Sequence, residues 1–197
     1  MDDHYVSQTF LRGFTNADGF LLPYYKGSPT PSGKATLPKS VCVESDGDSN
    51  KYFQDPRILD SYLPQFENPW KENVDRLRAH ELDYVTKYQM SGYIAFLRAC
   101  TPTAKRIGQE LIKAVLRPTV IETAQRVLND SPPSDPTIAD MIQHAIDRRE
   151  LEVDIDREFP HAIGIGNLLK STARFFNGEW HVLINNTSVP FLTKQPR

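Results

Sequence analysis

The sequence lacks the features that mark a secreted or membrane protein. No run approaches the roughly 18 consecutive apolar residues that a membrane span requires. The N-terminus shows no basic segment followed by an apolar one, so no secretory signal is visible. Cysteine is scarce: Cys42 and Cys100 have no CxxC partner and no neighbouring histidine cluster, which predicts two reduced thiols. We therefore expect a cytoplasmic protein with no membrane partner.

Catalytic and cofactor motifs are also missing. The sequence contains no nucleophile elbow, phosphate loop, HExxH element or dinucleotide fingerprint. Its five histidines never fall at helical metal-ligand spacing. The acidic segment ESDGDSN (residues 44–50) begins like a calcium loop but has no glutamate at the twelfth position, which favours a solvated turn. We expect no cofactor and no metal, and the sequence leaves open whether the protein is an enzyme.

Neither sign of charge dominates the chain. Lys and Arg number 23 against 25 Asp and Glu, which gives a net charge of −2. A general nucleic-acid binder carries a basic excess, so nucleic acid is not a favoured partner. A local basic face remains compatible with this composition.

The chain does contain enough apolar material for a folded core. Hydrophobic residues make up 39% and aromatic residues 10% of the 197 residues, which fits one domain of ordinary size. We predict a single domain over residues 1–197 in three parts. Residues 1–55 hold a helix, a strand and loops, residues 56–149 are helical, and residues 150–197 hold strand, helix and a β-hairpin.

The predicted fold class is α+β. A central helical bundle, from about Pro56 to Glu150, is expected to pack against a small, mostly antiparallel sheet. That sheet is expected to join the two ends of the chain. Its predicted strands are Phe20–Tyr25, Glu179–Asn185 and Pro190–Thr193.

Apolar residues at spacings of three and four predict the individual helices. The first is QTFLRGF (residues 8–14), whose aromatic face suggests a docking helix. Prolines suit first helical positions, so separate helices are expected to begin at Pro102 and at Pro118. Strict alternation in LEVDID (residues 151–156) predicts a half-buried strand. The other predicted helices are Trp70–His80, Tyr84–Ala99, one capped by Asp135 or Thr137, and Ala162–Phe176.

His4 is the unusual histidine because it precedes Tyr5 and an apolar helix almost at the N-terminus. One interpretation is a packed residue that caps or stacks. The other is a ligand-binding or acid–base group, which suits an imidazole of ordinary pKa ~6.5. At the other end of the chain Trp180, rather than the adjacent His181, is expected to face the core.

The segment FLRACTPTAKR (residues 96–106) is the second candidate site. Arg98 falls near a helix end, and Thr101-Pro102 begins the next helix. Exposed N–H groups at that helix start, with Lys105 and Arg106 nearby, are suited to holding an anion. The alternative is a capped helix junction with a buried structural arginine. The acids of residues 152–156 on one strand face are likewise either a divalent-metal site or a solvated edge.

Three motifs, in order along the chain, resemble a known family. HYVSQTFLRGFTNADGFLLPYYK resembles the opening HYVPQFYLRNF of the domain-of-unknown-function family number 4238, which occurs in bacteria and sporadically in fungi. LRACTP is similar to the family's R-T-P element, with two extra residues between the Arg and the Thr, and EWHVLINNTSVPFLTKQP is similar to its PFITSDNPV segment. The matching positions are His4, Tyr5, Val6, Gln8, Phe10, Leu11, Arg12, Phe14, Arg98, Thr101, Pro102, Trp180, Pro190, Phe191 and Thr193.

The resemblance implies a bacterial protein in which His4 and Arg12 belong to a recurring signature. The family's serine–aspartate pair reads Lys194-Gln195 here, and family members usually continue into more β-structure. This implies a short, degenerate or truncated form of the family domain. The family has no established biochemistry.

Three functions are therefore compared. The first is a binding or protein-interaction module without a complete catalytic set, whose partner is a protein or an anionic ligand. Its candidate binding residues are Tyr5, Thr101, Lys105, Arg106 and Trp180. The second is a hydrolase, nuclease or phosphoesterase-like, acting through a cleft formed by His4, Arg12 and Arg98. The third is a nucleic-acid binder with a local basic face. The residues do not fix the oligomeric state.

Overall fold

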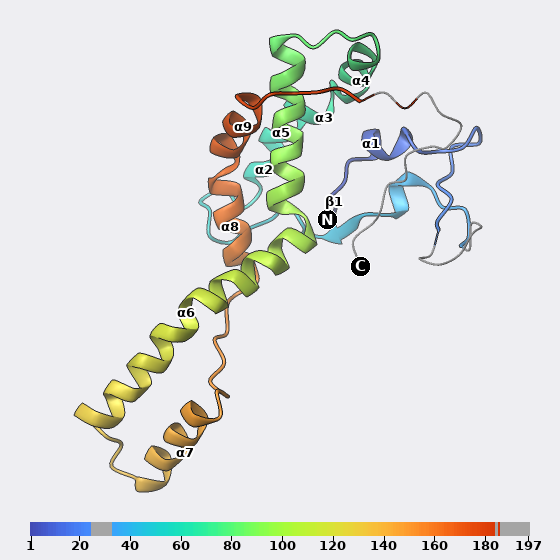
Figure 1. Ribbon diagram of the computed structural model, residues 1–197. Helices are drawn as coiled ribbons and strands as arrows, with labels where there is room; N and C mark the ends of the chain where they lie inside the picture. Colours follow the sequence, from blue (N-terminus) through green and yellow to red (C-terminus); the bar gives the residue numbers. More distant parts are fainter. Residues whose placement is uncertain (25–32, 184, 186–197) are drawn as a thin grey trace.

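Helix α5 (Tyr84–Cys100) lies at the centre of the structure, a computed structural model that describes residues 1–24, 33–183 and 185. The side chain of Asp83 caps the helix by accepting a hydrogen bond from the Thr86 amide. Tyr93 and Phe96, both fully buried, form the middle of the core. The helices that pack around α5 are α3 (Pro64–Glu67), α4 (Trp70–Arg78), α8 (Glu158–Gly166) and α9 (Leu168–Phe176) (Figure 1).

The core depends on one glycine. A Cβ atom on Gly92 would lie 2.0 Å from a ring carbon of Phe66, which is fully buried. Phe66 belongs to α3, which follows the short helix α2 (Ile58–Tyr62). Any larger residue at this position would displace the ring. The close approach of α3 to α5 therefore requires the missing side chain.

The N-terminal segment is docked on this core, as predicted. Helix α1 (Gln8–Arg12) is capped by Ser7, whose amide also donates a 3.0 Å hydrogen bond to the Tyr93 hydroxyl. Leu11 is buried, and the Phe10 ring packs 5.2 Å from the ring of Trp70. Aromatic burial thus holds the start of the chain against α4 and α5.

The α+β class with a small antiparallel sheet is confirmed, but the strands are not those predicted. The sheet pairs β1 (Asp2–His4) with β2 (Val43–Ser45), with Asp3 opposite Glu44. Phe20–Tyr25, described as far as residue 24, forms only an isolated bridge between Leu21 and Thr36.

The C-terminal part of the predicted sheet also differs. The described residues of Glu179–Asn185 form no strand, and Pro190–Thr193 lies outside the described residues. The physical reason for the observed pairing is a partly buried ion pair. Arg57 donates to both carboxylate oxygens of Asp3 at 2.8 and 2.9 Å, which fixes β1 beside the loop that follows β2.

Several predicted helices are confirmed within one or two residues, but Pro118 does not begin a new one. Helix α6 runs unbroken from Pro102 to Asp130, with Pro118 inside it. An internal proline removes one backbone hydrogen bond, here to the carbonyl of Ala114. Both residues are exposed, so water can satisfy that carbonyl and the helix continues.

The helix predicted over Ala162–Phe176 is two helices, α8 and α9, which meet at Asn167. Residues 151–156 keep the predicted alternation of half-buried and exposed side chains but join no sheet in the described structure. Gln109 of α6 donates a hydrogen bond to the backbone carbonyl of Ile155. The alternation therefore arises from an extended segment lying along a helix.

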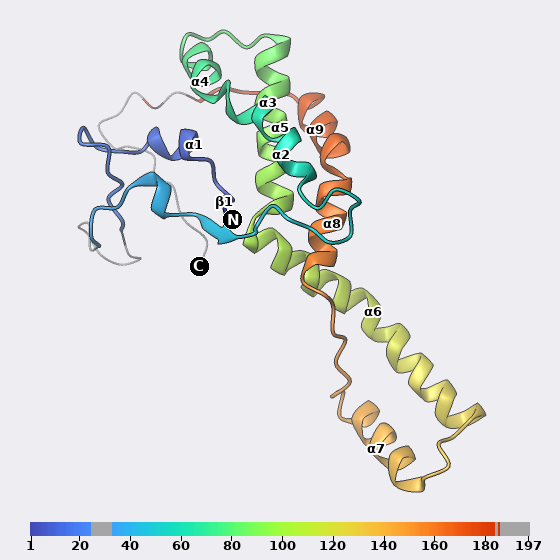
Figure 2. The same cartoon turned by 180° about the vertical axis from the view of Figure 1, so that it is seen from behind.

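Helix α6 and the antiparallel α7 (Pro136–Asp147) form an arm, residues 102–147, that projects from the body (Figures 1 and 2). Of the two predicted caps, Asp135 and Thr137, it is Asp135 that caps α7, by accepting from the Thr137 amide. In the described structure, neither helix of the arm contains a buried residue. Within the same residues, no helix combines the length and the hydropathy that a membrane span requires.

Candidate functional site

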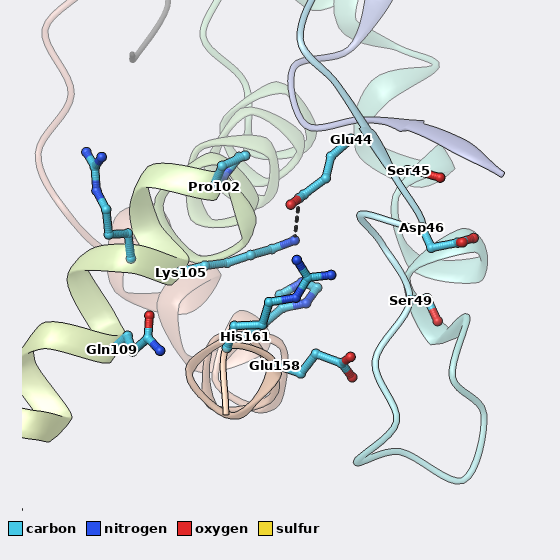
Figure 3. A pocket seen from close by; sticks show the side chains of 11 residues that line it. Glu44, Ser45, Asp46, Ser49, Pro102, Lys105, Gln109, Glu158 and His161 are labelled. Atoms are coloured by element: carbon cyan, nitrogen blue, oxygen red, sulfur yellow. Dashed lines mark hydrogen bonds and ion pairs between the residues drawn. The ribbon is translucent and has the colours of Figure 1, made fainter. Parts of the chain in front are cut away.

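A polar pocket lies where the arm joins the body, between α6, α8 and the loop after β2 (Figure 3). Its volume is about 180 Å³. We call it the foot pocket. Its walls are formed by Glu44, Ser45, Asp46, Ser49, Pro102, Lys105, Arg106, Gln109, Arg157, Glu158 and His161.

Lys105 connects the arm to the sheet through hydrogen bonds and does not point into solvent. Its Nζ atom donates to a carboxylate oxygen of Glu44 and to the carbonyl of Gly47, both at 2.8 Å. Only 15% of its side chain is exposed. The structure thus commits one of the predicted anion-binding residues to a contact within the protein.

The other two cations of the pocket are not committed in this way. Arg106 and Arg157 are exposed, and within the described residues neither forms a hydrogen bond or an ion pair. Arg106 follows Lys105 on α6, whereas Arg157 is the residue that immediately precedes α8. Two arginine residues from different elements therefore line the same pocket.

His161 forms the floor of the pocket and projects from α8 toward Lys105 (Figure 3). It is 1% exposed, and its Nε2 atom has no hydrogen-bond partner among the described residues. Burial, together with the positive charge of Lys105, lowers the pKa of His161 to about 4. The imidazole is therefore neutral at physiological pH, with one ring nitrogen unsatisfied.

Two carboxyl groups that do not line the pocket, those of Asp48 and Glu67, have raised pKa values. Burial, and then the nearby Asp3 carboxylate, raises the pKa of Asp48 to about 6. Burial, and then Asp48, raises the pKa of Glu67 to about 7.

The predicted solvated turn at residues 44–50 is wrong for Asp48 and Asn50, which are 8% and 0% exposed. Asn50 is buried because its amide donates to the backbone carbonyl of Glu158 in α8, a contact across 108 residues.

The structure does not bring the predicted hydrolase residues together. His4 lies in β1, where its Nε2 atom is 3.2 Å from the carbonyl of Lys39. Arg12 is exposed at the end of α1, and Arg98 lies over the ring of Phe175 at 5.8 Å. None of the three borders the foot pocket, and no hydrogen bond joins any two of them in the described structure.

The remaining predicted site residues have local structural contacts. Thr101 caps α6 by accepting from the Ala104 amide at 3.3 Å. Trp180 is half-buried and donates to the carbonyl of Phe175, whereas His181 is exposed; Trp180 is not among the residues that pack against the core cluster in the described structure. Tyr5 donates its amide to the carbonyl of Cys42. Because Arg98 is exposed, the helix junction contains no buried arginine.

The acids of residues 152–156 do not form a metal site in the described structure, where no group of three or more His, Cys, Asp or Glu residues is arranged to hold an ion. Asp156 instead pairs with Lys51. The solvated-edge interpretation holds for Glu152 and Asp154, both exposed.

Sequence reasoning found Lys105 and Arg106 but missed Arg157 and His161. These two residues are separated from the α6 residues by about fifty positions and belong to no motif. His161 stands in an apolar run, FPHAIGIG, that predicts only helix packing. The pocket is assembled by tertiary contacts that no local pattern records.

A second exposed feature lies on the arm. Ile107, Leu111 and Val115 follow each other at spacings of four residues on one face of α6 and are 54%, 62% and 73% exposed. We call these three residues the arm stripe. Near the far end of the arm, Ile138 and Met141 of α7 are also exposed, by 48% and 66%.

Comparison with known proteins gives one match. The model of a family described as "Protein of unknown function (DUF4238)" matches residues 3–194, almost the whole chain. No curated protein and no solved structure is similar enough to match.

Proposed function

The chain belongs to the DUF4238 family, and we propose that it is a protein-interaction module that pairs with a second copy of itself through the arm. The observation that carries this proposal is α6. It has 29 residues and an open apolar stripe, yet no residue of it is buried in the described structure. Most helices in proteins are stabilised by packing an apolar face, and α6 has such a face with no cover.

The arm is large enough for a stable interface. At 1.5 Å per residue and about 10 Å in width, α6 presents roughly 430 Å² and α7 roughly 180 Å². Two arms laid together would bury about 1,200 Å², the lower end of the range for specific protein interfaces. Each copy would contribute two helices, which gives the four-helix arrangement that apolar helical hairpins commonly form.

The charge pattern of the arm favours antiparallel pairing. The base of the arm, residues 102–117, has four basic residues and one acidic residue, for a net charge of +3. The outer part, residues 118–147, has five acidic residues and one basic residue, for a net charge of −4. In a two-fold dimer with antiparallel arms, each basic base faces the acidic outer part of the partner copy. Parallel arms would place like charges together.

The exposed apolar residues of the arm favour the same antiparallel orientation as its charges. The arm stripe lies on the base, and the exposed Ile138 and Met141 lie on the outer part. Antiparallel pairing sets the stripe of one copy against these two residues of the other. Charge and apolar surface thus support the same orientation.

Sedimentation velocity over a concentration series tests the proposal. We expect the wild-type chain to be dimeric at micromolar concentration and a variant with Leu111→Glu and Val115→Glu to be monomeric. These side chains are exposed, so the folded chain tolerates the change. The matched control is Leu169→Glu on α9, 66% exposed and outside the arm, which should remain dimeric. A monomeric wild type, or a dimer that survives the double change, would overturn the proposal.

A hydrolase acting through His4, Arg12 and Arg98 has less support. General acid–base catalysis requires these groups within hydrogen-bond reach of one substrate position. In the described structure, His4 lies beside Lys39, Arg98 lies over Phe175, Arg12 is exposed, and none of the three borders the foot pocket.

We also propose that the protein is bacterial and that it is located in the cytoplasm. The proposal is supported by the family resemblance and by the two cysteines, which are free and buried. Burial raises the pKa of Cys100 to about 12, so this thiol is unreactive at neutral pH.

A further inference from the structure

The first part of the chain, residues 1–24 and 33–50, is held to the helical body mainly by polar contacts. We call these residues the N-terminal unit, which contains β1, α1 and β2. The cluster of buried apolar residues begins at Leu59, and of the described unit Phe10 alone packs against it. The hydrogen-bonded contacts between unit and body include Ser7 with Tyr93, Asp3 with Arg57, and Glu44 with Lys105. Segments with few buried apolar contacts are those that open locally before the whole chain unfolds.

Two acidic side chains lie where this unit meets the body, and neither has a bonded partner. Asp48, in the loop after β2, is 8% exposed, and its carboxyl group forms no hydrogen bond or ion pair among the described residues. Glu67 of α3 is half-buried, and its carboxyl group likewise forms none there. The charge of Asp48 acts on Glu67, and that of Glu67 acts on Tyr93, whose hydroxyl bonds to the unit. A buried acid without a partner is tolerated as the neutral carboxyl group but is costly as the carboxylate.

The charged groups around the two acids do not neutralise them. Two acids and two bases from other elements face Asp48, namely Asp3, Asp60, Arg57 and Lys105. Both bases already donate to other carboxylates, which are those of Asp3 and Asp60 for Arg57 and that of Glu44 for Lys105. Glu67 faces the charge of Asp48 and, among the described residues, of no other group. Ionisation of the pair would therefore place two uncompensated negative charges at the junction.

The other titratable groups at the junction do not ionise with the pair. Burial raises the pKa values of Cys100 and Tyr93 on α5 to about 12, so both stay neutral at physiological pH. Burial, and then Lys105, lowers the pKa of His161 on α8 to about 4. If opening exposes His161, its effect on docking has the opposite sign to that of the acids. The acids are therefore best isolated by substitution.

The raised pKa values of the two acids set the sign of the pH dependence. Burial raises the pKa of Asp48 to about 6 and that of Glu67 to about 7, against ordinary values of 3.8 and 4.5. The docked unit thus retains two protons that these side chains release once they reach water. Docking therefore weakens as the pH rises from about 4 to about 7, and the effect levels off above that window.

We propose that Asp48 and Glu67 form a pH-sensitive switch: the N-terminal unit is docked on α3 and α5 while both carboxyl groups are neutral, and it opens locally more readily once they ionise. Opening breaks the Ser7–Tyr93 contact and exposes the aromatic surface of Trp70 and Tyr93 against which Phe10 packs. The switch lies outside the arm, so it does not depend on dimerisation.

Hydrogen exchange followed by NMR between pH 4.5 and pH 8 tests the proposal, with each rate corrected for the intrinsic pH dependence of exchange. The probe is the amide of Ser7, which bonds to Tyr93 across the junction. The reference is the amide of Ala95, which is fully buried in α5. We expect Ser7 to be less protected than Ala95 at pH 8. We expect its protection factor to fall at least about tenfold across the range, because opening releases protons from two acids.

Asp48→Asn and Glu67→Gln remove the ionisation while keeping the shape of each side chain. Each change should make the protection of Ser7 less dependent on pH, and the double variant should lose most of that dependence. The matched control is Glu81→Gln, an exposed acid after α4, which should follow the wild type. The proposal is overturned if Ser7 is as protected as Ala95 at pH 8, because the unit then opens only with the whole chain. It is equally overturned if the double variant keeps the wild-type pH dependence.

Discussion

Helices α5 and α6 follow each other directly along the chain, yet they differ in how many of their residues are buried. Helix α5 buries eight of its 17 residues, whereas α6 buries none of its 29 in the described structure. Both carry many apolar side chains, so apolar content alone does not separate them. The difference lies in how the two helices are covered. Helices α3, α4, α8 and α9 pack on α5, whereas α7 and α8 pack on α6 and leave the arm stripe exposed in the described structure.

The two helices are separated at Thr101. This residue precedes a proline and adopts an extended backbone, with φ −70° and ψ 155°. It therefore ends α5 and caps α6 in one step, and the chain changes direction there. The body is thus built around its own core, whereas neither helix of the arm contains a buried residue in the described structure.

The largest expected effect comes from truncating one apolar residue in the core around α5 and one on the exposed stripe of α6, and comparing the losses of stability. Phe66→Ala, in the fully buried core, should lower the free energy of unfolding by about 3–5 kcal/mol. Leu111→Ala, on the exposed stripe, should change that of the monomer by less than about 0.5 kcal/mol. Urea denaturation at dilute protein concentration measures both. Similar losses would mean that the arm is part of the same core.

A smaller effect is expected from the polar contact that holds β1 to the body. Asp3→Asn removes the charge of a carboxylate that is 8% exposed and bonded twice to Arg57, and should cost about 2 kcal/mol. Asp46→Asn is the control. Its carboxylate is 64% exposed, so its loss should cost less than about 0.5 kcal/mol.

The Asp3 contact also predicts a pH dependence. Burial opposes ionisation, but the hydrogen bonds from Arg57 outweigh it, and the pKa of Asp3 lies below its ordinary 3.8. The stabilisation is therefore present above pH 3.8 and is lost as the pH falls through the folded-state pKa. The difference between wild type and Asp3→Asn in urea denaturation should close at that acidic limit, and a constant difference would contradict the ion pair.

Glu67 gives a dependence of the opposite sign. Its pKa is about 7 in the folded chain against an ordinary 4.5, so ionisation destabilises the fold as the pH rises through this window. Glu67→Gln should be more stable than the wild type by about 1–2 kcal/mol at pH 8 and equal to it at pH 4, since the half-buried carboxyl is partly solvated. Thermal unfolding at the two pH values measures this. An unchanged difference between them would rule out the raised pKa.

The smallest predicted effect concerns the charges of the arm. Asp140→Lys on α7 should weaken the dimer by roughly 2- to 30-fold, because exposed ion pairs contribute about 0.2–1 kcal/mol each and the two-fold axis doubles the change. Lys113→Glu in the same chain should restore part of the affinity. Sedimentation equilibrium at low salt measures both dissociation constants. Weakening by the second change as well would argue against antiparallel arms.

Local patterns predicted several of the helices well. Spacings of three and four gave α4 and α5, and the aspartate before Pro136 gave the start of α7, because helices and caps depend on residues a few positions apart. Proline gave the start of α6 correctly but a false start at Pro118, since an exposed helix can hydrate the carbonyl that a proline leaves free.

The sheet and the foot pocket were beyond local reasoning. Strand β1 exists because Arg57 pairs with Asp3 and because Val43–Ser45 lies beside it, contacts that span 39 residues or more. His161 and Arg157 reach the pocket only through the packing of α8 on α6. The prediction of one domain over the whole chain stays a prediction.

Spin labels on the arm test its antiparallel pairing most directly. Both native cysteines are buried, so labels would attach to an introduced cysteine, either Thr119→Cys near the middle of α6 or Ser131→Cys at its far end. Double electron–electron resonance on each singly labelled chain measures the distance between the two copies. Antiparallel arms predict a short distance for residue 119 and roughly 40 Å for residue 131, about the length of α6. A short distance for residue 131, or no distance between copies at either position, would contradict the proposed dimer.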